Sequence, residues 1–279
     1  MRAMAMALAL CACKGAEDFV IEEHPDDPLP ASWFDPDGYG LLDVATGQAV
    51  GEAEDPRCQV RAQFAVAEVR GESERTMWKN QCALYPDLEM EGEAGLRPAG
   101  GGVVVFGLGA MSRNVTAPPE WNPAVDLDCE TQLSGPLVSA QSADLEDADD
   151  EAPEFSLEVE RPAPVVIDAP FADQFPTARF EAAGSLEVRW SGEGLPGSGV
   201  EILLESRAAE DDGDGIVRCW TPDDGSHVIH RSLVDLFRDQ PSTVTVSRVN
   251  VVHTEDLEGW GIRLAWWEST SRFVLNAGE

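Results

Sequence analysis

Apolar and polar residues alternate with a period of two along most of the chain, and helical periodicity is nearly missing. The clearest stretch is 58–66, where Val60 and Phe64 fall on one face of a predicted strand and the polar residues fall on the other. Residues 76–84 are predicted to form a partner strand. Residues 103–106 are all apolar and bounded by glycines, which predicts a strand covered on both faces. This pattern predicts an all-β protein.

The second half alternates more regularly still. In 186–190 the apolar positions include Trp190, and the charged residues lie between them. Further strands are predicted at 200–204, 216–220, 227–230, 243–252, 262–266 and 273–275. A series of short strands within about 100 residues, with a tryptophan inside an early one, is typical of an immunoglobulin-like sandwich.

Two segments depart from simple alternation. Within 243–252 the apolar positions switch from even to odd numbers, which predicts a β-bulge near Ser247 and Arg248. Residues 232–238 form the one credible helical segment, with Ser232 as its N-cap. Its apolar face would consist of Leu233, Leu236 and Phe237.

Prolines cluster near 170–176 and predict a boundary between two β-sandwich-like domains. The first, 31–170, is a β-rich domain whose topology the sequence does not define. It contains the acidic run 142–154, which is expected to be a loop because adjacent like charges repel. The second, 171–279, is the predicted immunoglobulin-like sandwich.

The first thirteen residues have the layout of a secretion signal, with one arginine, an apolar run and small residues. The sequence Leu10-Cys11-Ala12-Cys13 resembles the lipobox of bacterial lipoproteins. That resemblance implies lipidation at Cys13 and an outer-membrane anchor in a Gram-negative cell envelope. Residues 14–30, rich in proline and acid, would be a disordered tether, so the only membrane contact expected is through the lipid. The alternative is an ordinary apolar N-terminal helix.

The charge is strongly negative: 52 Asp and Glu oppose 19 Lys and Arg in 279 residues, for a net charge of −33. Such a surface repels phosphate backbones, so no nucleic-acid partner is expected. Either the chain binds calcium specifically, or its acidic surface is heavily hydrated and suited to a salty environment, where salt screens the repulsion between like charges. The second interpretation is favoured because the carboxylates are scattered along the whole chain.

Four of the six cysteines lie beyond the predicted signal, and an even number in an exported chain predicts disulfides. Three pairings are open. Proximity in the sequence favours Cys58 with Cys82, while Cys219 fits a buried free thiol. This part of the chain has no Cys-x-x-Cys spacing for a metal.

The segment 210–215 resembles the front of a calcium loop, with ligands expected from Glu210, Asp212 and Asp214. Thr221 stands where such a loop needs a bidentate glutamate, so a plain acidic hairpin is the competing interpretation. Weak calcium binding is therefore the one cofactor considered. His227 and His230 would lie on opposite faces of a strand, which is unfavourable for a shared metal.

Trp266 and Trp267 are adjacent in a predicted strand, so Trp266 is expected in the core and Trp267 outside it. An outward tryptophan is typical of sugar or protein contact surfaces, unless another domain or a loop covers it. No Gly-x-Ser-x-Gly motif and no phosphate-binding glycine loop is present, so no catalytic residue is proposed from the sequence.

The strand 101–106, the hinge Pro164-Val165-Val166-Ile167-Asp168-Ala169-Pro170 and the strand 185–191 resemble lipoproteins of unknown function from myxobacteria and their relatives. The segments around 217–219 and 228–229 carry most of this likeness, and the acidic run departs from it. The resemblance implies no activity.

The sequence favours a non-enzymatic module of the cell envelope that binds a protein or a polysaccharide. The alternatives are an extracellular hydrolase with a carboxylate site, and a calcium-stabilised adhesion module. Convergent carboxylates of perturbed pKa would favour the hydrolase, whereas an exposed aromatic patch would favour binding.

Overall fold

The computed structural model describes residues 38–50, 57–67, 77–79, 81–85, 96–117, 124–133, 135–143, 152–169, 177–179, 184–192, 194, 198–206, 216–237, 241–254, 257 and 259–275. Three β-sheets and only short helical segments make up this part of the chain, which confirms the predicted all-β class. No helix among these residues is long and apolar enough to cross a membrane.

The large sheet has 11 strands in the order β3-β4-β15-β14-β17-β18-β1-β2-β5, with β12 beside β18 and β8 beside β2. β1 and β18 run parallel, from Gly38 beside Trp260 to Val50 beside Arg272. The strands are β1 (Gly38–Val50), β2 (Arg57–Ala67), β3 (Met77–Lys79), β4 (Cys82–Tyr85), β5 (Leu96–Pro98), β8 (Val125–Leu127), β12 (Thr177–Arg179), β14 (Gly199–Ser206), β15 (Ile216–Pro222), β17 (Ser242–His253) and β18 (Trp260–Leu275).

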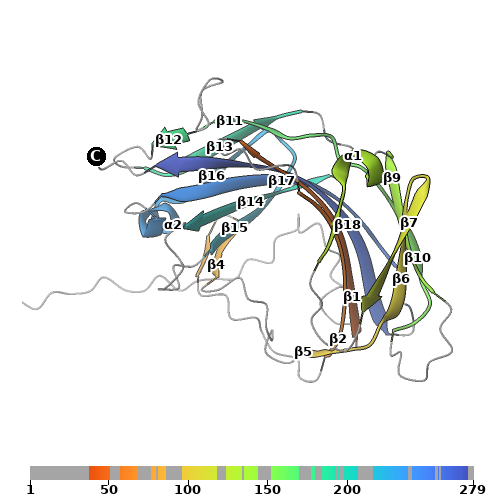
Figure 1. Ribbon diagram of the computed structural model, residues 1–279. Coiled ribbons are helices and arrows are strands. Elements are labelled where there is room, and N and C mark those ends of the chain that lie inside the picture. The colour runs from red at the N-terminus through yellow and green to blue at the C-terminus, as the bar shows by residue number, and fades with distance from the viewer. Residues whose placement is uncertain are drawn as a thin grey trace, which may run out of the picture.

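Two smaller sheets pack on one face of the large sheet, which we call its inner face (Figure 1). The four-stranded sheet has the order β10-β9-β6-β7, from β6 (Gly102–Leu108), β7 (Met111–Ala117), β9 (Leu137–Ser142) and β10 (Ser156–Glu160). The three-stranded sheet has the order β11-β13-β16, from β11 (Val166–Ala169), β13 (Leu186–Ser191) and β16 (Ser226–Ile229).

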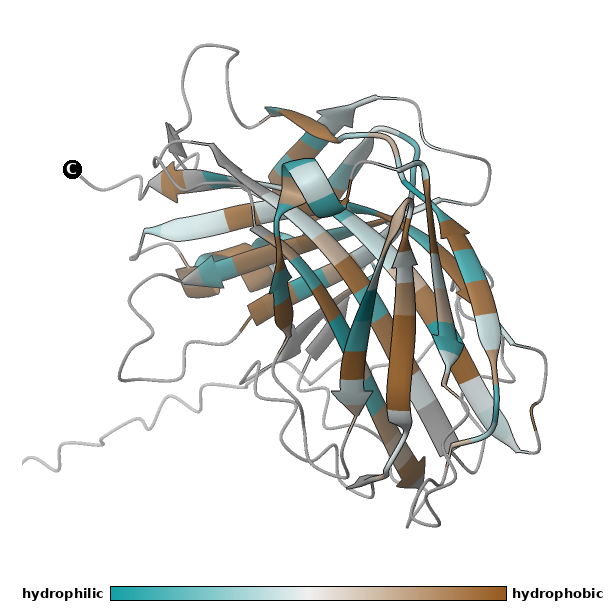
Figure 2. Cartoon of the chain, turned by 45° about the vertical axis from the view of Figure 1, so that its right-hand side comes forward, coloured by the Kyte–Doolittle hydropathy of each residue, from teal (hydrophilic) through white to brown (hydrophobic). Residues whose placement is uncertain are grey.

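Each smaller sheet closes its own hydrophobic core against the large sheet. Along the strands, apolar and polar residues alternate, so one face of each strand is available for packing (Figure 2). The first core lies under the four-stranded sheet and contains Phe64, Phe106 and Trp266. The second lies under the three-stranded sheet and contains Trp190, Ile202 and other apolar residues. Trp266 is fully buried, which confirms its expected inward orientation.

The predicted boundary near residue 170 does not separate two independent domains. β4, from the first half of the chain, pairs with β15, and β1 pairs with β18 along its whole length. β11, which ends the predicted first domain, belongs to the three-stranded sheet. The two sandwich-like units are therefore built from both halves and share one continuous sheet.

The predicted β-bulge in β17 is wrong. β17 pairs in uninterrupted register with both β14 and β18. The apolar positions switch because Arg248 occupies the inner face as a fully buried cation, while Val249 is buried on the opposite face. We call that opposite face the outer face of the large sheet.

The helical segment begins one residue earlier than predicted. α2 spans Arg231–Val234 and continues as a 3-10 turn, η2 (Asp235–Phe237). Its N-cap is His230, whose Nδ1 accepts from the backbone N–H of Ser232, so Ser232 is not the cap. Leu233 and Phe237 reach the second core, whereas Leu236 is half exposed and does not share their face.

Arg248 joins the three-stranded sheet to the large sheet. Its Nε donates to Asp223 Oδ2 at 2.6 Å and its Nη2 donates to Oδ1 at 3.1 Å, while Trp190 Nε1 donates to the same Oδ1 at 2.8 Å. The remaining guanidinium N–H groups donate to three backbone carbonyls, those of Ala163, Pro164 and Gly192. All the donors of this buried cation are therefore satisfied.

Gly192 is required for this cation to fit. Its φ is +104°, and a Cβ there would lie 2.8 Å from the Pro164 carbonyl oxygen and 3.0 Å from Arg248 Nη1. We expect Gly192→Ala to lower the free energy of unfolding by about 1 to 3 kcal/mol, measured by urea denaturation. Gly184→Ala is the matched control, since its Cβ would meet nothing within 4 Å. Equal stability of the two variants would contradict this account.

Candidate functional site

Two tryptophans lean toward each other across the outer face of the large sheet. Trp220 lies on β15 and Trp267 on β18, with β14 and β17 between them. Three strand spacings amount to about 14 Å, yet the ring centroids are 5.5 Å apart with an interplanar angle of 56°. Val249, beside Trp267 in the register, is fully buried here. Trp267 therefore points away from both cores as predicted, but it is half-buried and in contact with Trp220.

An ion pair flanks Trp220. Glu201 on β14 is directly opposite Trp220 in the register, and its carboxylate accepts from Arg218 Nε. The Arg218 guanidinium lies over the Trp220 ring, 5.4 Å from its centroid. The Glu201 side chain is 5% exposed and that of Arg218 is 32% exposed. This end of the site thus presents a cation and an aromatic face above a buried acid.

A second ionic group flanks Trp267. Asp43 on β1 accepts from Arg61 Nη2 at 2.8 Å and from Trp267 Nε1 at 3.1 Å. Arg263 Nη2 lies 3.8 Å from Asp43 Oδ1. Asp43 is buried, while the Arg61 side chain is 44% exposed. The two tryptophans are therefore bracketed by two carboxylates, each held by arginine.

The two carboxyl groups have pKa values displaced in opposite directions. Burial opposes ionisation of Asp43, but the guanidinium groups of Arg263 and Arg61, with hydrogen bonds from Arg61 and Trp267, outweigh it and hold the Asp43 pKa below its usual range. Burial raises the pKa of Glu201, and the Arg218 guanidinium offsets only part of this. Burial and the nearby Glu201 also raise the pKa of Glu205.

Asp43 is expected to make the protein sensitive to acid. Because its pKa is lower in the folded than in the unfolded chain, its stabilising effect is present above the unfolded value of 3.8 and is lost as pH falls through the folded value. We expect the difference in unfolding free energy between wild type and Asp43→Asn to be largest near neutral pH and to shrink below pH 3.8. Urea unfolding across this pH range measures it.

Glu201 provides a control of opposite sign. Its folded pKa is raised, so its contribution is present below the unfolded value of 4.5 and is lost as pH rises through the folded value. The difference between wild type and Glu201→Gln should therefore shrink as pH increases from 4.5. Parallel pH profiles for wild type and both variants would contradict the two assignments.

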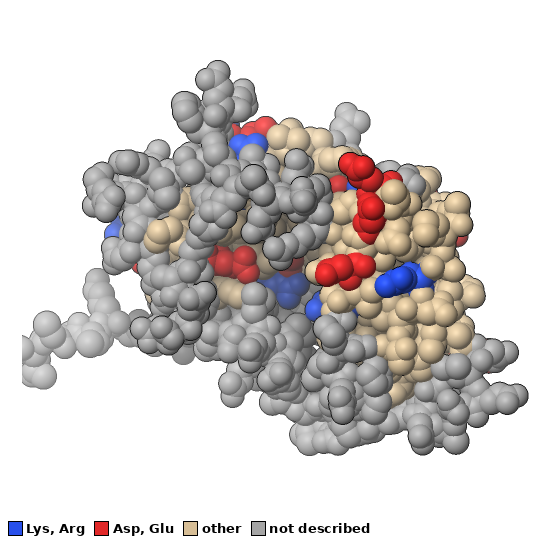
Figure 3. Space-filling model, in the orientation of Figure 1, with Lys and Arg blue, Asp and Glu red and all other residues tan. Residues whose placement is uncertain are grey.

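The whole outer-face cluster, which we call the tryptophan face, comprises Asp43, Arg61, Glu201, Arg218, Trp220, Arg263 and Trp267. In Figure 3, acidic and basic side chains of the described residues lie next to one another across one face of the molecule. Chemically, the tryptophan face offers half-buried aromatic rings with planar hydrogen-bonding groups at both ends. Such a combination suits a ligand with flat apolar faces and a hydroxyl-rich edge.

The disulfides differ from the favoured pairing of Cys58 with Cys82, which is wrong. Cys58 bonds Cys129, and Cys82 bonds Cys219, so Cys219 is not a free thiol. Both bonds link segments far apart in the sequence, with separations of 71 and 137 residues. The pairing predicted from proximity in the sequence failed because strand pairing brings Cys82 directly opposite Cys219.

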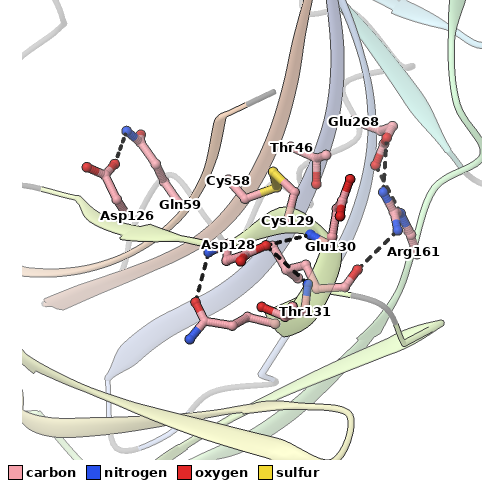
Figure 4. The surroundings of a disulfide bond; sticks show 12 residues. Thr46, Cys58, Gln59, Asp126, Asp128, Cys129, Glu130, Thr131, Arg161 and Glu268 are labelled. Carbon is pink, nitrogen blue, oxygen red and sulfur yellow. Dashed lines mark hydrogen bonds and ion pairs between the residues drawn. A yellow bond between two sulfur atoms is a disulfide. The ribbon is translucent and has the colours of Figure 1, made fainter. Parts of the chain in front are cut away.

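The Cys58–Cys129 disulfide attaches a short helix, α1 (Cys129–Gln132), to β2 (Figure 4). Asp128 is the N-cap of α1 and accepts from the backbone N–H groups of Glu130 and Thr131. These hydrogen bonds, that of Thr131 first, lower the pKa of the Asp128 carboxyl. Beside the helix, Arg161 donates to the Leu133 carbonyl and to both carboxylate oxygens of Glu268. These contacts fix α1 to β2 and to β18.

The Cys82–Cys219 disulfide has a histidine beside it. Cys82 Sγ and His227 Nε2 are 3.3 Å apart. His227 lies on β16 of the three-stranded sheet, whereas both cysteines lie in the large sheet. His227 thus faces the second core, while His230 lies beyond the end of β16 and caps α2, so the two histidines do not share one strand as predicted.

Several predicted site residues lie outside the described residues. These are the lipidation site Cys13 and the calcium ligands Glu210, Asp212 and Asp214. Lipidation and calcium binding therefore stay predictions. Most of the acidic run, 144–151, lies outside the described residues as well.

Sequence reasoning found Trp267 but missed its partners. Glu201 interrupts the apolar run 200–204, and Asp43 does the same between Leu42 and Val44. An acid alternating with core positions in a strand normally indicates a solvated face, so nothing in the sequence distinguished Glu201 and Asp43 from ordinary surface acids. Only strand order brings Trp220 next to Trp267.

Comparison with known proteins identifies no family: no protein-family model and no curated protein matches the chain. Among solved structures, the chain is similar to a 1.5-MDa bacterial ice-binding adhesin, with 11% identity, a TM-score of 0.23, and coverage of 86% of this chain and 65% of that one. It is also similar to a Ca²⁺-stabilised ice-binding adhesin from an Antarctic bacterium, with 13% identity, a TM-score of 0.22, and coverage of 87% and 50%. The chain thus spans less than two thirds of either protein. TM-scores this low carry no functional argument.

Proposed function

We propose that this chain is a non-enzymatic binding module of the cell envelope and that its tryptophan face binds a polysaccharide. The observation that carries the proposal is the contact between Trp220 and Trp267 across the outer face, bracketed by Asp43–Arg61 and Glu201–Arg218. Sugar rings have apolar faces that stack on indole rings and hydroxyl groups that bond to arginine and carboxylate.

The charge of the chain narrows the class of ligand. With a net charge of −33, the chain repels uronic-acid and phosphate polymers at low salt. Neutral or amine-bearing polysaccharides therefore fit best. Export to the cell envelope accords with the two disulfides, which persist in oxidising compartments. Anchoring through Cys13 remains part of the proposal.

Fluorescence titration with soluble neutral and amine-bearing polysaccharides, such as a mixed-linkage glucan and chitosan, tests the proposal. Binding should quench or shift tryptophan emission. Trp220→Ala and Trp267→Ala should each weaken binding about 10-fold or more, as expected for aromatic contact residues. Trp267→Phe keeps an aromatic ring but loses the hydrogen bond to Asp43, so an intermediate effect is expected.

Met111→Ala is the matched control, because Met111 is an exposed apolar residue of the four-stranded sheet, away from the tryptophan face. It should bind as wild type does. Circular dichroism establishes that every variant is folded. If no polysaccharide binds, or if the tryptophan variants bind as tightly as Met111→Ala, the proposed function is wrong.

The opposite pKa displacements of Glu201 and Asp43 favour hydrolysis as a second candidate function. A carboxyl group of raised pKa beside a carboxylate of lowered pKa on one face resembles the acid pair that glycoside cleavage uses. The same polysaccharides distinguish the two functions. Release of reducing ends by wild type but not by Glu201→Gln would establish a hydrolase, whereas binding without release supports the binding module.

A further inference from the structure

Two cysteines and one histidine from three distant segments converge in the second core. Their ligand atoms, the Sγ atoms of Cys82 and Cys219 and a ring nitrogen of His227, all lie within 4.8 Å of one another. Both sulfurs are fully buried and His227 is half-buried. Among the described residues, this is the one group of three or more His, Cys, Asp or Glu residues with the spacing to hold a metal ion.

The distances fit a tetrahedral zinc site once the disulfide is opened. With Zn–S near 2.3 Å and Zn–N near 2.05 Å, tetrahedral geometry places a sulfur and a nitrogen about 3.6 Å apart and two sulfurs about 3.8 Å apart. Cys82 Sγ and His227 Nε2 are already 3.3 Å apart. Two sulfurs joined in a disulfide are about 2.05 Å apart, so each would move by about 0.9 Å when the bond opens. Side-chain rotation alone can supply a shift of this size.

The backbone around the donors already holds them in place. Cys82 and Cys219 are directly opposite each other on β4 and β15, and the ladder between these strands fixes their separation without the disulfide. His227 comes from β16, whose pairing with β13 places Val188 opposite it. Because the three-stranded sheet packs over the large sheet, the histidine approaches the sulfurs from the facing layer. A metal here would join the two layers.

We propose that the chain with reduced Cys82 and Cys219 binds one zinc ion through these two thiolates and His227. Three protein ligands leave a fourth position for water or another small ligand. Cys82 and Cys219 thus form a disulfide when oxidised, and together with His227 they form a metal site when reduced. This inference is independent of the proposed polysaccharide binding, since the donors lie on the inner face and the tryptophan face lies on the other side of the sheet.

The chemistry balances with a thiol reductant of the glutathione class. Two reductant thiols supply two electrons and two protons, so that Cys82 and Cys219 become thiols and the reductant sulfurs form their own disulfide. Zinc then displaces the two thiol protons of Cys82 and Cys219 and accepts the nitrogen lone pair of neutral His227. Metal binding therefore releases two protons in total. Oxidation by a small-molecule disulfide reverses the sequence and releases the metal.

Cobalt(II) titration of the full chain tests the proposal, because tetrahedral thiolate-bound cobalt has visible absorption bands that zinc removes by competition. All proteins carry Cys11→Ser and Cys13→Ser, so that these two thiols do not contribute. The reduced protein should bind one cobalt ion per chain and the oxidised protein none. Cys82→Ser/Cys219→Ser should lose the signal, and His227→Ala should bind at least about 10-fold more weakly with altered bands.

Cys58→Ser/Cys129→Ser is the matched control, since it removes the other disulfide and leaves the proposed donors intact. It should keep the cobalt spectrum if folded. Should that variant fail to fold, His227→Ala in the otherwise unchanged reduced protein decides the question. Absence of thiolate–cobalt bands in the reduced protein, or equal spectra with and without Cys82, Cys219 or His227, would overturn the proposal.

Discussion

Replacement of Arg248 by methionine is expected to lower the free energy of unfolding by about 3 to 5 kcal/mol. The Arg248 side chain is 0% exposed and that of Asp223 is 9% exposed. Removing the guanidinium leaves the Asp223 carboxylate buried without its cation. It also leaves three backbone carbonyls without the donors that Arg248 supplies. Urea denaturation at neutral pH measures the loss.

Two further variants test whether burial, rather than ion pairing as such, makes the Arg248 variant so destabilising. Arg231→Met removes the exposed i,i+4 pair with Asp235, where the side chains are 62% and 39% exposed, and should cost under about 0.5 kcal/mol. Arg248→Met combined with Asp223→Leu should recover part of the loss, because no charge is then left buried. If Arg248→Met and Arg231→Met cost the same, the buried pair has no special role.

Removing the Cys58–Cys129 disulfide should lower the free energy of unfolding by about 4 kcal/mol. The bond closes a loop of 71 residues, and its loss frees the unfolded chain to adopt many more conformations. It also releases α1 from β2. The double variant Cys58→Ser/Cys129→Ser, compared with wild type under non-reducing conditions by urea denaturation, measures this loss.

Gln59→Ala is the neighbouring control, because Gln59 follows Cys58 but lies on the other strand face, where it donates to Asp126. The Gln59→Ala substitution should change the free energy of unfolding by no more than about 0.5 kcal/mol. A disulfide variant as stable as Gln59→Ala would mean that the Cys58–Cys129 crosslink does not stabilise the fold.

The tryptophan face explains why apolar residues occur on both sides of β17 and β18. Val249 and Ala265 are fully buried although they point away from both cores. The rings of Trp220 and Trp267 lie on this side of the sheet, so the outer face has a small apolar centre with an ion pair at each end. A ligand that stacks on the tryptophans would extend an existing apolar contact.

The all-β class followed from the sequence because strand periodicity is a local property. Alternation along β13 and β2, and the inward position of Trp266, need only the rule that neighbouring side chains in a strand point to opposite faces. The helix near residue 232 was likewise found locally, but its cap was misplaced because His230 performs a role that Ser232 equally suits.

The order of the strands in the sheets could not be predicted from the sequence. Alternation states which face is apolar but not which strand lies beside it, and the parallel pairing of β1 with β18 joins opposite ends of the described chain. The predicted boundary near 170 failed for this reason. The predicted bulge in β17 failed because a fully satisfied arginine can occupy a core position that local rules reserve for apolar residues.

The sequence by itself thus determined the class of fold, the inward and outward faces of the strands, and the acidic charge that disfavours polyanionic ligands. Only the tertiary structure decided the disulfide partners, the contact between Trp220 and Trp267, and the approach of His227 to Cys82. The physical reason is that strand periodicity depends only on neighbouring residues, and net charge only on composition. Sites form where strands distant in sequence meet, and that meeting depends on how the whole chain buries its apolar surface.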